Sequence, residues 1–391
     1  MINSSGSGST RKEETLPFCH QDLLRSSNRC CIDKTSTAEL SEAINSMYRW
    51  YEKASVCYVY LADVENDPLL KRWKDEEWAS QQTQGPSTAD SPFARSRWFT
   101  RGWTLQELLA QENVQFFSKT FQPLGSKHDL RFVLKFITEI SIYALDWFSS
   151  DRYCAAEKMS WAAQRQTTRT EDMAYCLFGL FDIHMPLIYG EGRKAFRRLQ
   201  EEIMKTTNDQ TLFAWGADNL RVWNNKATGH ASHKTTRSTF SLVGATEDLD
   251  GSLFAGSPSN FRKSKFVAAM SVRHVGRDYE MPPMMMGAGL RIALPVISDS
   301  DHEGNLSGLQ LARKALEEKN MVVAILSCFF TSDLSFCLGI PLISRGEFYS
   351  RAGDLVLVSR DGLEVGSVGQ DKMTKILYIK QHPPYSKEYR Y

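Results

Sequence analysis

The six residues Val56–Leu61 constrain the fold of this chain more than any other stretch. They are β-branched, aromatic or otherwise apolar on both faces, which is typical of strands covered on both sides, as in parallel sheets. Residues 36–39, Ser-Thr-Ala-Glu, match a helix capping box, and an apolar stripe carries the predicted helix to about Lys53. A helix followed at once by a buried strand predicts α/β layering. Asp63 follows the strand, at the carboxyl end where open α/β sheets bind ligands.

The stretch Ser96–Leu109 combines two tryptophans, two arginines and one glutamate with a leucine-rich segment. If residues 104–111 are helical, three leucines share one face, and Glu107 lies one turn from Trp103 beside that face. Burial there would disfavour the charged carboxylate and raise the pKa of Glu107, which makes it a candidate site residue. The alternative is that Glu107 is solvated or caps a neighbouring group, as most helical carboxylates are surface residues.

The rest of the first half of the chain alternates between strands and helices. A polar excursion over residues 67–92 is longer than an ordinary connection. The pattern then predicts a strand at Val114–Phe117 and helices over about 129–142, from an N-cap at Thr170 to Phe181, and over about 193–205. Gly190-Glu191-Gly192 lacks the remaining residues of a phosphate loop and is interpreted as a turn. The basic residues Arg193, Lys194, Arg197 and Arg198 are followed by Glu201 and Glu202, which favours a self-paired helix surface over a nucleic-acid patch.

The pattern of apolar and polar residues changes beyond residue 215. Short apolar runs, separated by Gly, Ser and Pro, predict a β-rich region with strands at 240–243, 290–294, 321–330, 355–358 and 376–379. The apolar, methionine-rich segment Pro282–Gly287 is interpreted as a flexible loop that packs, or else binds. The expected organisation is therefore a divergent or disordered segment 1–29, an α/β domain 30–125, a helical region 126–215 and a β-rich domain 216–391.

Composition restricts the class of protein. The net charge of +1 gives no electrostatic argument for nucleic acid or an anionic membrane. No stretch approaches the roughly 20 apolar residues that cross a bilayer, and the polar residues 1–10 do not form a signal core. The 8 cysteines include no C-x-x-C pair, which predicts reduced, buried thiols and no metal site. We therefore expect a cytoplasmic protein, or else a nuclear one, without nucleic-acid or membrane partners.

Several long motifs, in order, resemble the HET domain of fungal heterokaryon-incompatibility proteins. These are Cys31-Ile32-Asp33-Lys34, the segment 42–51, the segment 54–61, and Ser96–Leu109. Residues 159–175 and 185–192 resemble the helical region that usually follows that domain, and residues 209–215 resemble its end. The resemblance covers roughly residues 30–215, whereas the C-terminal part is similar only loosely, as the β-rich tail of such proteins.

This resemblance implies a role in fungal non-self recognition and in programmed cell death after fusion of unlike cells. The HET fold is thought to be related to TIR domains, which have a flavodoxin-like parallel sheet, and some TIR domains cleave NAD at the nicotinamide–ribose bond. By similarity, Glu107 matches their catalytic glutamate, which would stabilise an oxocarbenium-like centre. Asp63, Trp98 and Trp103 would at most line the NAD site. NAD would be a substrate, and no resident cofactor is expected.

The chain departs from the family pattern at its beginning. A HET domain starts with a strand that ends in a Ser-His-Thr-Trp-Gly type motif, and nothing here resembles it. In a flavodoxin-like order that strand would neighbour Val56–Leu61, which we therefore expect to form an unprotected edge of an incomplete flavodoxin- or TIR-like sheet. The leading hypothesis is a truncated, degenerate HET domain that acts through protein partners and self-association. The alternatives are a NAD-cleaving toxin that uses Glu107 and an unrelated structural role.

Overall fold

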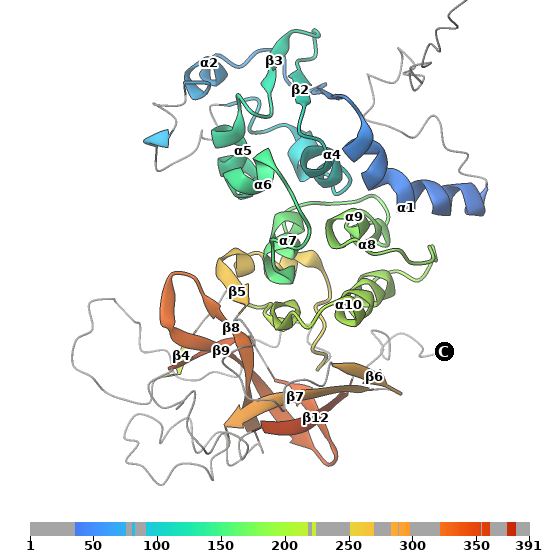
Figure 1. Cartoon of the computed structure of the whole chain (residues 1–391), viewed down its shortest axis with the longest axis vertical. Coiled ribbons are helices and arrows are strands. Elements are labelled where there is room, and N and C mark those ends of the chain that lie inside the picture. The colour runs from blue at the N-terminus through green and yellow to red at the C-terminus, as the bar shows by residue number, and fades with distance from the viewer. Residues whose placement is uncertain are drawn as a thin grey trace, which may run out of the picture.

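The computed structural model describes residues 36–75, 80–82, 91–217, 221–223, 251–269, 283–287, 289–297, 321–352, 354–359 and 374–380 (Figure 1). The predicted segment 1–29, the strand at 240–243 and parts of the 67–92 excursion lie outside these residues. Within them, an α/β part lies at one end of the molecule, helices lie in the middle, and a β-rich part lies at the other end (Figure 1).

The α/β part is built around a three-stranded sheet. Its elements are α1 (Thr37–Lys53), β1 (Cys57–Tyr60), α2 (Leu69–Trp73), the 3₁₀ helix η2 (Arg97–Thr100), α4 (Thr104–Ala110), β2 (Val114–Phe117) and β3 (Pro123–Ser126). β1 and β2 are parallel, with Cys57 opposite Val114, and β3 joins β2 antiparallel. The predicted helices and the first two strands are therefore confirmed, whereas the short antiparallel β3 was not predicted.

The sequence signals at α1 act as expected. The Ser36 hydroxyl accepts a hydrogen bond from the backbone N–H of Glu39, at 3.3 Å, which satisfies a free donor at the helix start. The apolar face of α1 packs against α4 and α9 (Phe178–Phe181). Contact with α9 is close, because a Cβ on Gly179 would lie 2.2 Å from the Cβ and Cγ atoms of Tyr48. Glycine at this position lets the two helices approach each other.

The helical layer is more fragmented than its periodicity predicts. It comprises α5 (Arg131–Thr138), α6 (Ile142–Asp146), α7 (Ala155–Ala162), α8 (Asp172–Tyr175), α9, α10 (Lys194–Thr206) and η3 (Gln210–Phe213). The predicted helix 129–142 ends where Glu139 adopts a left-handed conformation, and α6 starts anew with Ser141 as its cap. The predicted continuous helix to Phe181 is wrong, because it divides into α8 and α9. Thr170 is not its N-cap either, since α8 follows Glu171.

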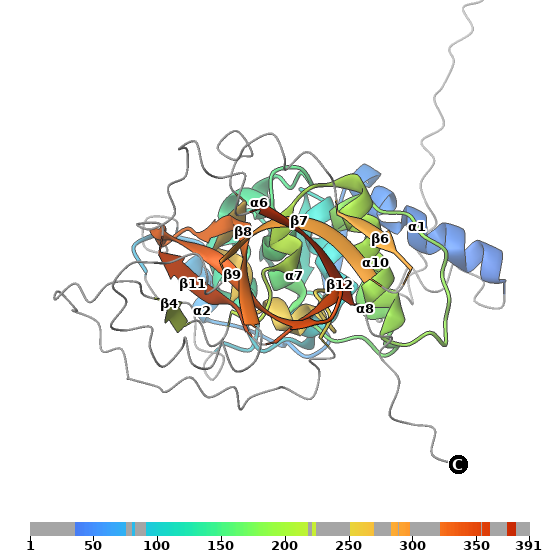
Figure 2. The same cartoon turned by 90° about the horizontal axis from the view of Figure 1, so that it is seen from below.

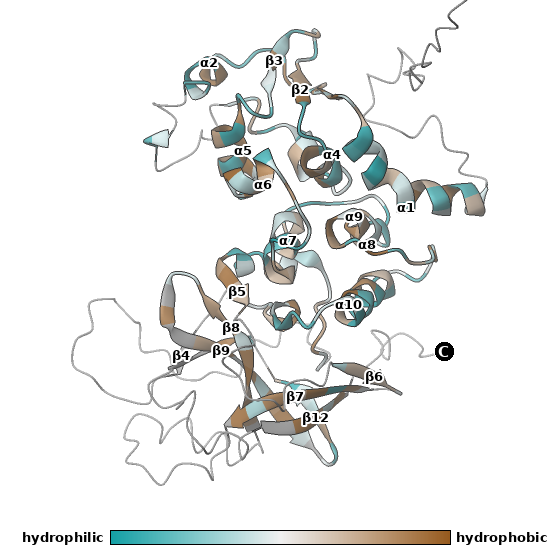
Figure 3. Cartoon of the chain, in the orientation of Figure 1, coloured by the Kyte–Doolittle hydropathy of each residue, from teal (hydrophilic) through white to brown (hydrophobic). Residues whose placement is uncertain are grey.

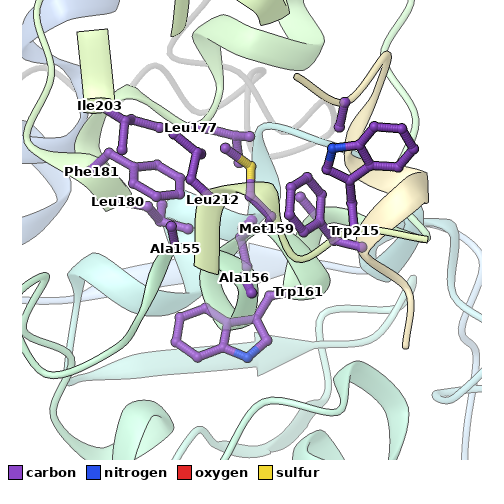
Figure 4. Close-up of a cluster of buried hydrophobic side chains, with 14 of the residues drawn as sticks. Ala155, Ala156, Met159, Trp161, Leu177, Leu180, Phe181, Ile203, Leu212 and Trp215 are labelled. Atoms are coloured by element: carbon purple, nitrogen blue, oxygen red, sulfur yellow. The ribbon is translucent and has the colours of Figure 1, made fainter. Parts of the chain in front are cut away.

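Helix α10 confirms the interpretation of its charges. Arg197 and Glu201 form an i,i+4 ion pair at 2.9 Å, and Lys205 pairs with Glu202 at 2.7 Å. The opposite face of the helix is apolar and buried. It belongs to a hydrophobic cluster that joins α7, α8, α9, α10 and the segment 212–215 (Figure 4). The labelled members are Ala155, Ala156, Met159, Trp161, Leu177, Leu180, Phe181, Ile203, Leu212 and Trp215.

The β-rich part contains a closed ring of strands. Its strands are β4 (Arg221–Trp223), β5 (Val267–Ala269), β6 (Met284–Met286), β7 (Gly289–Ile297), β8 (Met321–Phe330), β9 (Asp333–Arg345), β10 (Phe348–Arg351), β11 (Val356–Ser359) and β12 (Thr374–Lys380). The pairings β7–β8, β8–β9, β9–β10, β10–β12 and β12–β7 close on themselves. Seen from below, these strands curve around a common centre (Figure 2).

The strands of the ring carry many hydrophobic residues (Figure 3). The buried residues include Leu290, Ile292, Leu294, Val296, Leu326, Leu338, Ile340, Leu342, Leu377 and Ile379. The prediction of a β-rich region is thus confirmed in the part of the chain that the structure describes. Residues 284–286 form the strand β6, and Met284 and Met286 are half exposed there.

Two further expectations concern helices and cysteines. In the described ranges, no helix is long and apolar enough to cross a bilayer. Cys57, Cys176 and Cys328 are buried free thiols, as the absence of paired cysteine motifs predicts.

Candidate functional site

Asp63, directly after β1, holds the turn that leads into η2. Its two carboxylate oxygens accept hydrogen bonds from the Ser96 hydroxyl and the Arg97 backbone N–H, both at 2.8 Å. The Ser96 hydroxyl in turn accepts from the backbone N–H of Trp98, at 3.3 Å. This arrangement aims the Trp98 indole inward, where it is 5% exposed and packs edge-on against Phe99 and Phe116.

Glu107 lies on α4 at the other end of that indole. The Trp98 Nε1–H donates to Glu107 Oε2 at 3.3 Å, and the Tyr51 side chain of α1 makes a second hydrogen bond to the carboxylate. Glu107 is only 9% exposed, so its carboxylate is enclosed rather than open to solvent. Burial raises the pKa of Glu107, against the opposing effects of Arg101, Trp98, Tyr51 and Arg165. The predicted direction of the shift is therefore present.

The Tyr51 hydroxyl is the donor in its bond to Glu107. Burial, and then the Glu107 charge, raise the pKa of Tyr51 well above its ordinary value, so the phenol keeps its proton. Burial likewise raises the pKa of the nearby Cys57 thiol. Tyr51 and Cys57 therefore form a protonated wall beside Glu107. Sequence reasoning named neither as a site residue, although Tyr51 lies in the helix predicted to end near Lys53 and Cys57 lies in the predicted strand Val56–Leu61.

Two buried cations fix the ends of α4. At its start, Arg165 Nη1 donates to the Arg101 carbonyl and to the Thr104 hydroxyl, both at 2.9 Å. At its end, Lys127 Nζ donates to the carbonyls of Leu108, at 3.1 Å, and Gln111. Burial lowers the pKa of Arg165 to about 10 and that of Lys127 to about 8. A cation at the C-terminal carbonyls of a helix is favourable, and α4 is held rigidly as a result.

Trp103 does not belong to the Glu107 cluster. Its Nε1–H donates to Asp172 Oδ2 of α8, at 3.3 Å, on a different side of α4. The next turn makes a second contact with the helical layer, where Gln106 Nε2 donates to the Cys176 carbonyl at 2.7 Å. Of the four predicted site residues, the structure thus brings Trp98 and Glu107 into contact. Asp63 is connected to them through residues 96–97, and Trp103 is separate.

A second polar cluster surrounds the turn before α10, and the sequence analysis did not find it. Glu171 Oε1 accepts from the backbone N–H groups of Gly190, at 2.8 Å, and Gly192, at 2.9 Å. Burial raises the pKa of Glu171, but these bonds from Gly192 and Gly190 outweigh it and lower the pKa overall. Asp172 accepts from the Tyr189 hydroxyl at 2.9 Å. The sequence signal for this cluster was the Gly190-Glu191-Gly192 turn. Both glycines adopt positive φ, which lets their backbone N–H groups point to one acceptor.

The geometry limits the chemistry of the Glu107 cluster. The carboxylates of both Asp63 and Glu107 already accept hydrogen bonds from their neighbours. Glu107 is also largely enclosed, with 9% of its surface exposed. Among the described residues, no group of three or more His, Cys, Asp or Glu side chains is arranged to bind a metal ion.

Comparisons with known proteins identify relatives of two parts of the chain. The model of the heterokaryon incompatibility protein (HET) family matches residues 27–107, which includes Trp98 and Glu107. A domain of unknown function, DUF8212, matches residues 194–340. The chain is also 46% identical over 197 residues to the vegetative incompatibility protein HET-E-1 of Podospora anserina. That alignment covers 49% of this chain but only 14% of the relative. No solved structure matches the chain.

Proposed function

Because residues 27–107 match the HET family and the chain is similar to a fungal vegetative incompatibility protein, we propose that it acts in heterokaryon incompatibility as a protein-interaction module rather than as an enzyme. In this role it would contribute to non-self recognition and to the cell-death response in the cytoplasm, through protein partners. The observation that carries the proposal is the state of Glu107. The residue is 9% exposed, and its carboxylate is hydrogen-bonded to Trp98 and Tyr51, so that it supports the packing of α1, η2 and α4.

The contacts of α4 with the helical layer also support this role. Trp103 and Gln106 bond to Asp172 and to the Cys176 carbonyl, and the backbone N–H of Gly102 donates to the Gln166 carbonyl at 2.9 Å. A displacement of α4 would therefore disturb both the α/β part and the helical layer. Such coupling suits a module whose surface responds to a protein partner.

NAD cleavage is the second candidate function, and one observation favours it. Glu107 lies within the matched HET region beside an indole, and burial raises the pKa of its carboxyl group, as in many catalytic sites. At a pH above this raised pKa, the ionised Glu107 could hold the ribose and stabilise an oxocarbenium-like centre as nicotinamide leaves. Trp98 would line the site, with Asp63 and Trp103 further away. NAD would be a substrate, with no resident cofactor.

The two functions are distinguished by incubating the purified chain with NAD and measuring released nicotinamide. The interaction role predicts no release from the wild type or from Glu107→Gln, even at high protein concentration. Release that is lost in Glu107→Gln would overturn the interaction role and establish the second candidate. A cellular test complements this assay: the incompatibility response of a fungal strain that expresses the chain should survive Glu107→Gln. A response abolished by this variant, while its fold and abundance are intact, would contradict a non-catalytic role.

A further inference from the structure

β1 presents an open edge of the three-stranded sheet. Cys57 and Leu61 donate their backbone N–H groups to Asn113 and Phe117, both at 2.9 Å, so alternate residues of β1 face β2. The backbone N–H and C=O groups of Tyr58 and Tyr60 therefore point to the opposite edge. In the described part of the chain, β1 pairs with β2 alone. An edge of this kind is a template for a further strand.

The outer face of the same strand is aromatic and partly uncovered. Tyr58 is 48% exposed and meets Phe117 edge-on, with ring centroids 5.8 Å apart. Tyr60 stacks on Phe121, with centroids 4.8 Å apart, and Phe121 is 47% exposed. The inner side chains, Cys57 and Val59, are already buried. The edge thus offers free backbone groups and apolar side chains together, without a Lys or Pro within β1 to block pairing.

We propose that this edge binds a second copy of the chain, β1 against β1 in antiparallel orientation about a two-fold axis. Since Tyr58 and Tyr60 carry the outward backbone groups, the axis would pass at Val59, and Tyr58 of each copy would bond to Tyr60 of the other. Both tyrosines lie on one face, so two aromatic cross-strand pairs form. A two-fold arrangement needs a self-complementary surface, and this short strand is one.

Charge at the ends of the strand agrees with the same occupant. Exposed Lys53 precedes β1 and exposed Glu65 follows it. Antiparallel pairing brings the amino end of one β1 near the carboxyl end of the other, so Lys53 of each copy approaches Glu65 of its partner. Glu65 already lies 3.1 Å from Lys119, so the contact would be a surface network of modest strength. The result is a continuous six-stranded sheet, an ordinary size for a protein sheet.

The test compares two lysine substitutions at neighbouring positions. Tyr58 and Gln115 are directly paired in the β1–β2 register and lie on the same outer face, but only Tyr58 is on the edge. Tyr58→Lys should therefore abolish self-association, whereas Gln115→Lys should leave it intact. Mass is measured by analytical ultracentrifugation from low to high micromolar concentration, with the circular dichroism spectrum of each variant as a check on folding. The wild type should pass from 44.5 kDa to twice that mass.

Hydrogen exchange provides a measurement that needs no variant. Exchange of the Tyr58 and Tyr60 amides in the wild type should slow as the concentration rises, because only the pairing protects them. The proposal is overturned if the wild type stays at 44.5 kDa throughout, or if Tyr58→Lys associates like the wild type. Equal loss in both variants would also overturn it, because the contact would then use the sheet face rather than the edge. Although it rests on the proposed interaction role, the pairing is measured as a mass, independently of any cell-death response.

Discussion

Removal of the Glu107 carboxylate tests whether the cluster around it is structural. In Glu107→Ala, the Trp98 indole N–H and the Tyr51 hydroxyl lose their shared acceptor while they stay buried. Each buried donor without a partner costs about 1–3 kcal/mol, and two donors are affected. Because the substitution also removes the cost of burying a carboxylate, part of this loss is offset. We therefore expect a net loss of about 2–4 kcal/mol. Glu107→Gln keeps an amide oxygen as acceptor, and its expected loss is about 1 kcal/mol.

The assay is thermal unfolding followed by circular dichroism at pH 7. For a cooperative unit of about 150–250 residues, a loss of 1 kcal/mol in stability lowers the Tm by about 2–4 °C. The Tm should therefore fall by roughly 4–16 °C in Glu107→Ala and by about 2–4 °C in Glu107→Gln. Glu42→Ala is the matched control, because Glu42 is an exposed glutamate on α1. It should change stability by less than about 0.5 kcal/mol. If the Tm of Glu107→Ala equals or exceeds that of the wild type, the structural role of Glu107 is refuted. Such an increase is expected when a catalytic residue is strained in the folded protein.

Three further predictions concern pH and packing. Burial raises the pKa of Glu107 above its unfolded value of about 4.3, so the stabilising contribution of its carboxyl group is present below that pH and is lost as pH rises through the folded pKa. Between pH 4 and pH 7, the Tm of Glu107→Gln should therefore rise relative to that of the wild type. A Tm difference that stays constant over this range would contradict the argument. Burial lowers the pKa of Lys127 to about 8, against about 10.4 in the unfolded chain. The free energy of unfolding should therefore rise between these two pH values in the wild type but not in Lys127→Met. Chemical denaturation at pH 8 and at pH 10 measures this difference. Gly179→Ala should cost about 1–3 kcal/mol in thermal unfolding, because its Cβ would overlap Tyr48. Gly256→Ala is the control, as the nearest atom there is 3.9 Å away, and equal effects of the two substitutions would refute the packing argument.

Local sequence signals predict the fold where one element depends on its own residues. The α1 cap, the β1 run and the amphipathic α10 are of this kind, and all three are present. The signals fail where packing overrides periodicity. Residues 172–181 are apolar around most of the circumference, yet the chain divides into α8 and α9, and Gly179 packs against Tyr48. β3 was missed because Pro123-Leu-Gly-Ser has little strand propensity and is held by its antiparallel partner β2.

The candidate site shows the same division. The sequence identified Glu107 as a carboxylate beside an apolar face and predicted its raised pKa, and both features are present. It placed Trp103 beside Glu107, whereas the structure places Trp98 there. The remaining partners, Tyr51 and Arg165, come from elements 56 and 58 residues away in the chain, as the numbering shows. Periodicity is a local signal and carries no information about such distant pairs.

The closed ring of β7, β8, β9, β10 and β12 imposes an order on synthesis of the chain. β12, at Thr374–Lys380, lies between β7 and β10 and completes the ring, so the ring cannot close until the last of its residues has left the ribosome. Until then β7 and β10 keep open edges, which are prone to pair with other chains. The matched DUF8212 region ends at residue 340, within β9, so a fragment cut at that boundary would lack residues 341–345 of β9 and the three strands β10, β11 and β12. Closure of the ring in an expressed fragment therefore requires the chain to extend as far as Lys380, the last residue of β12.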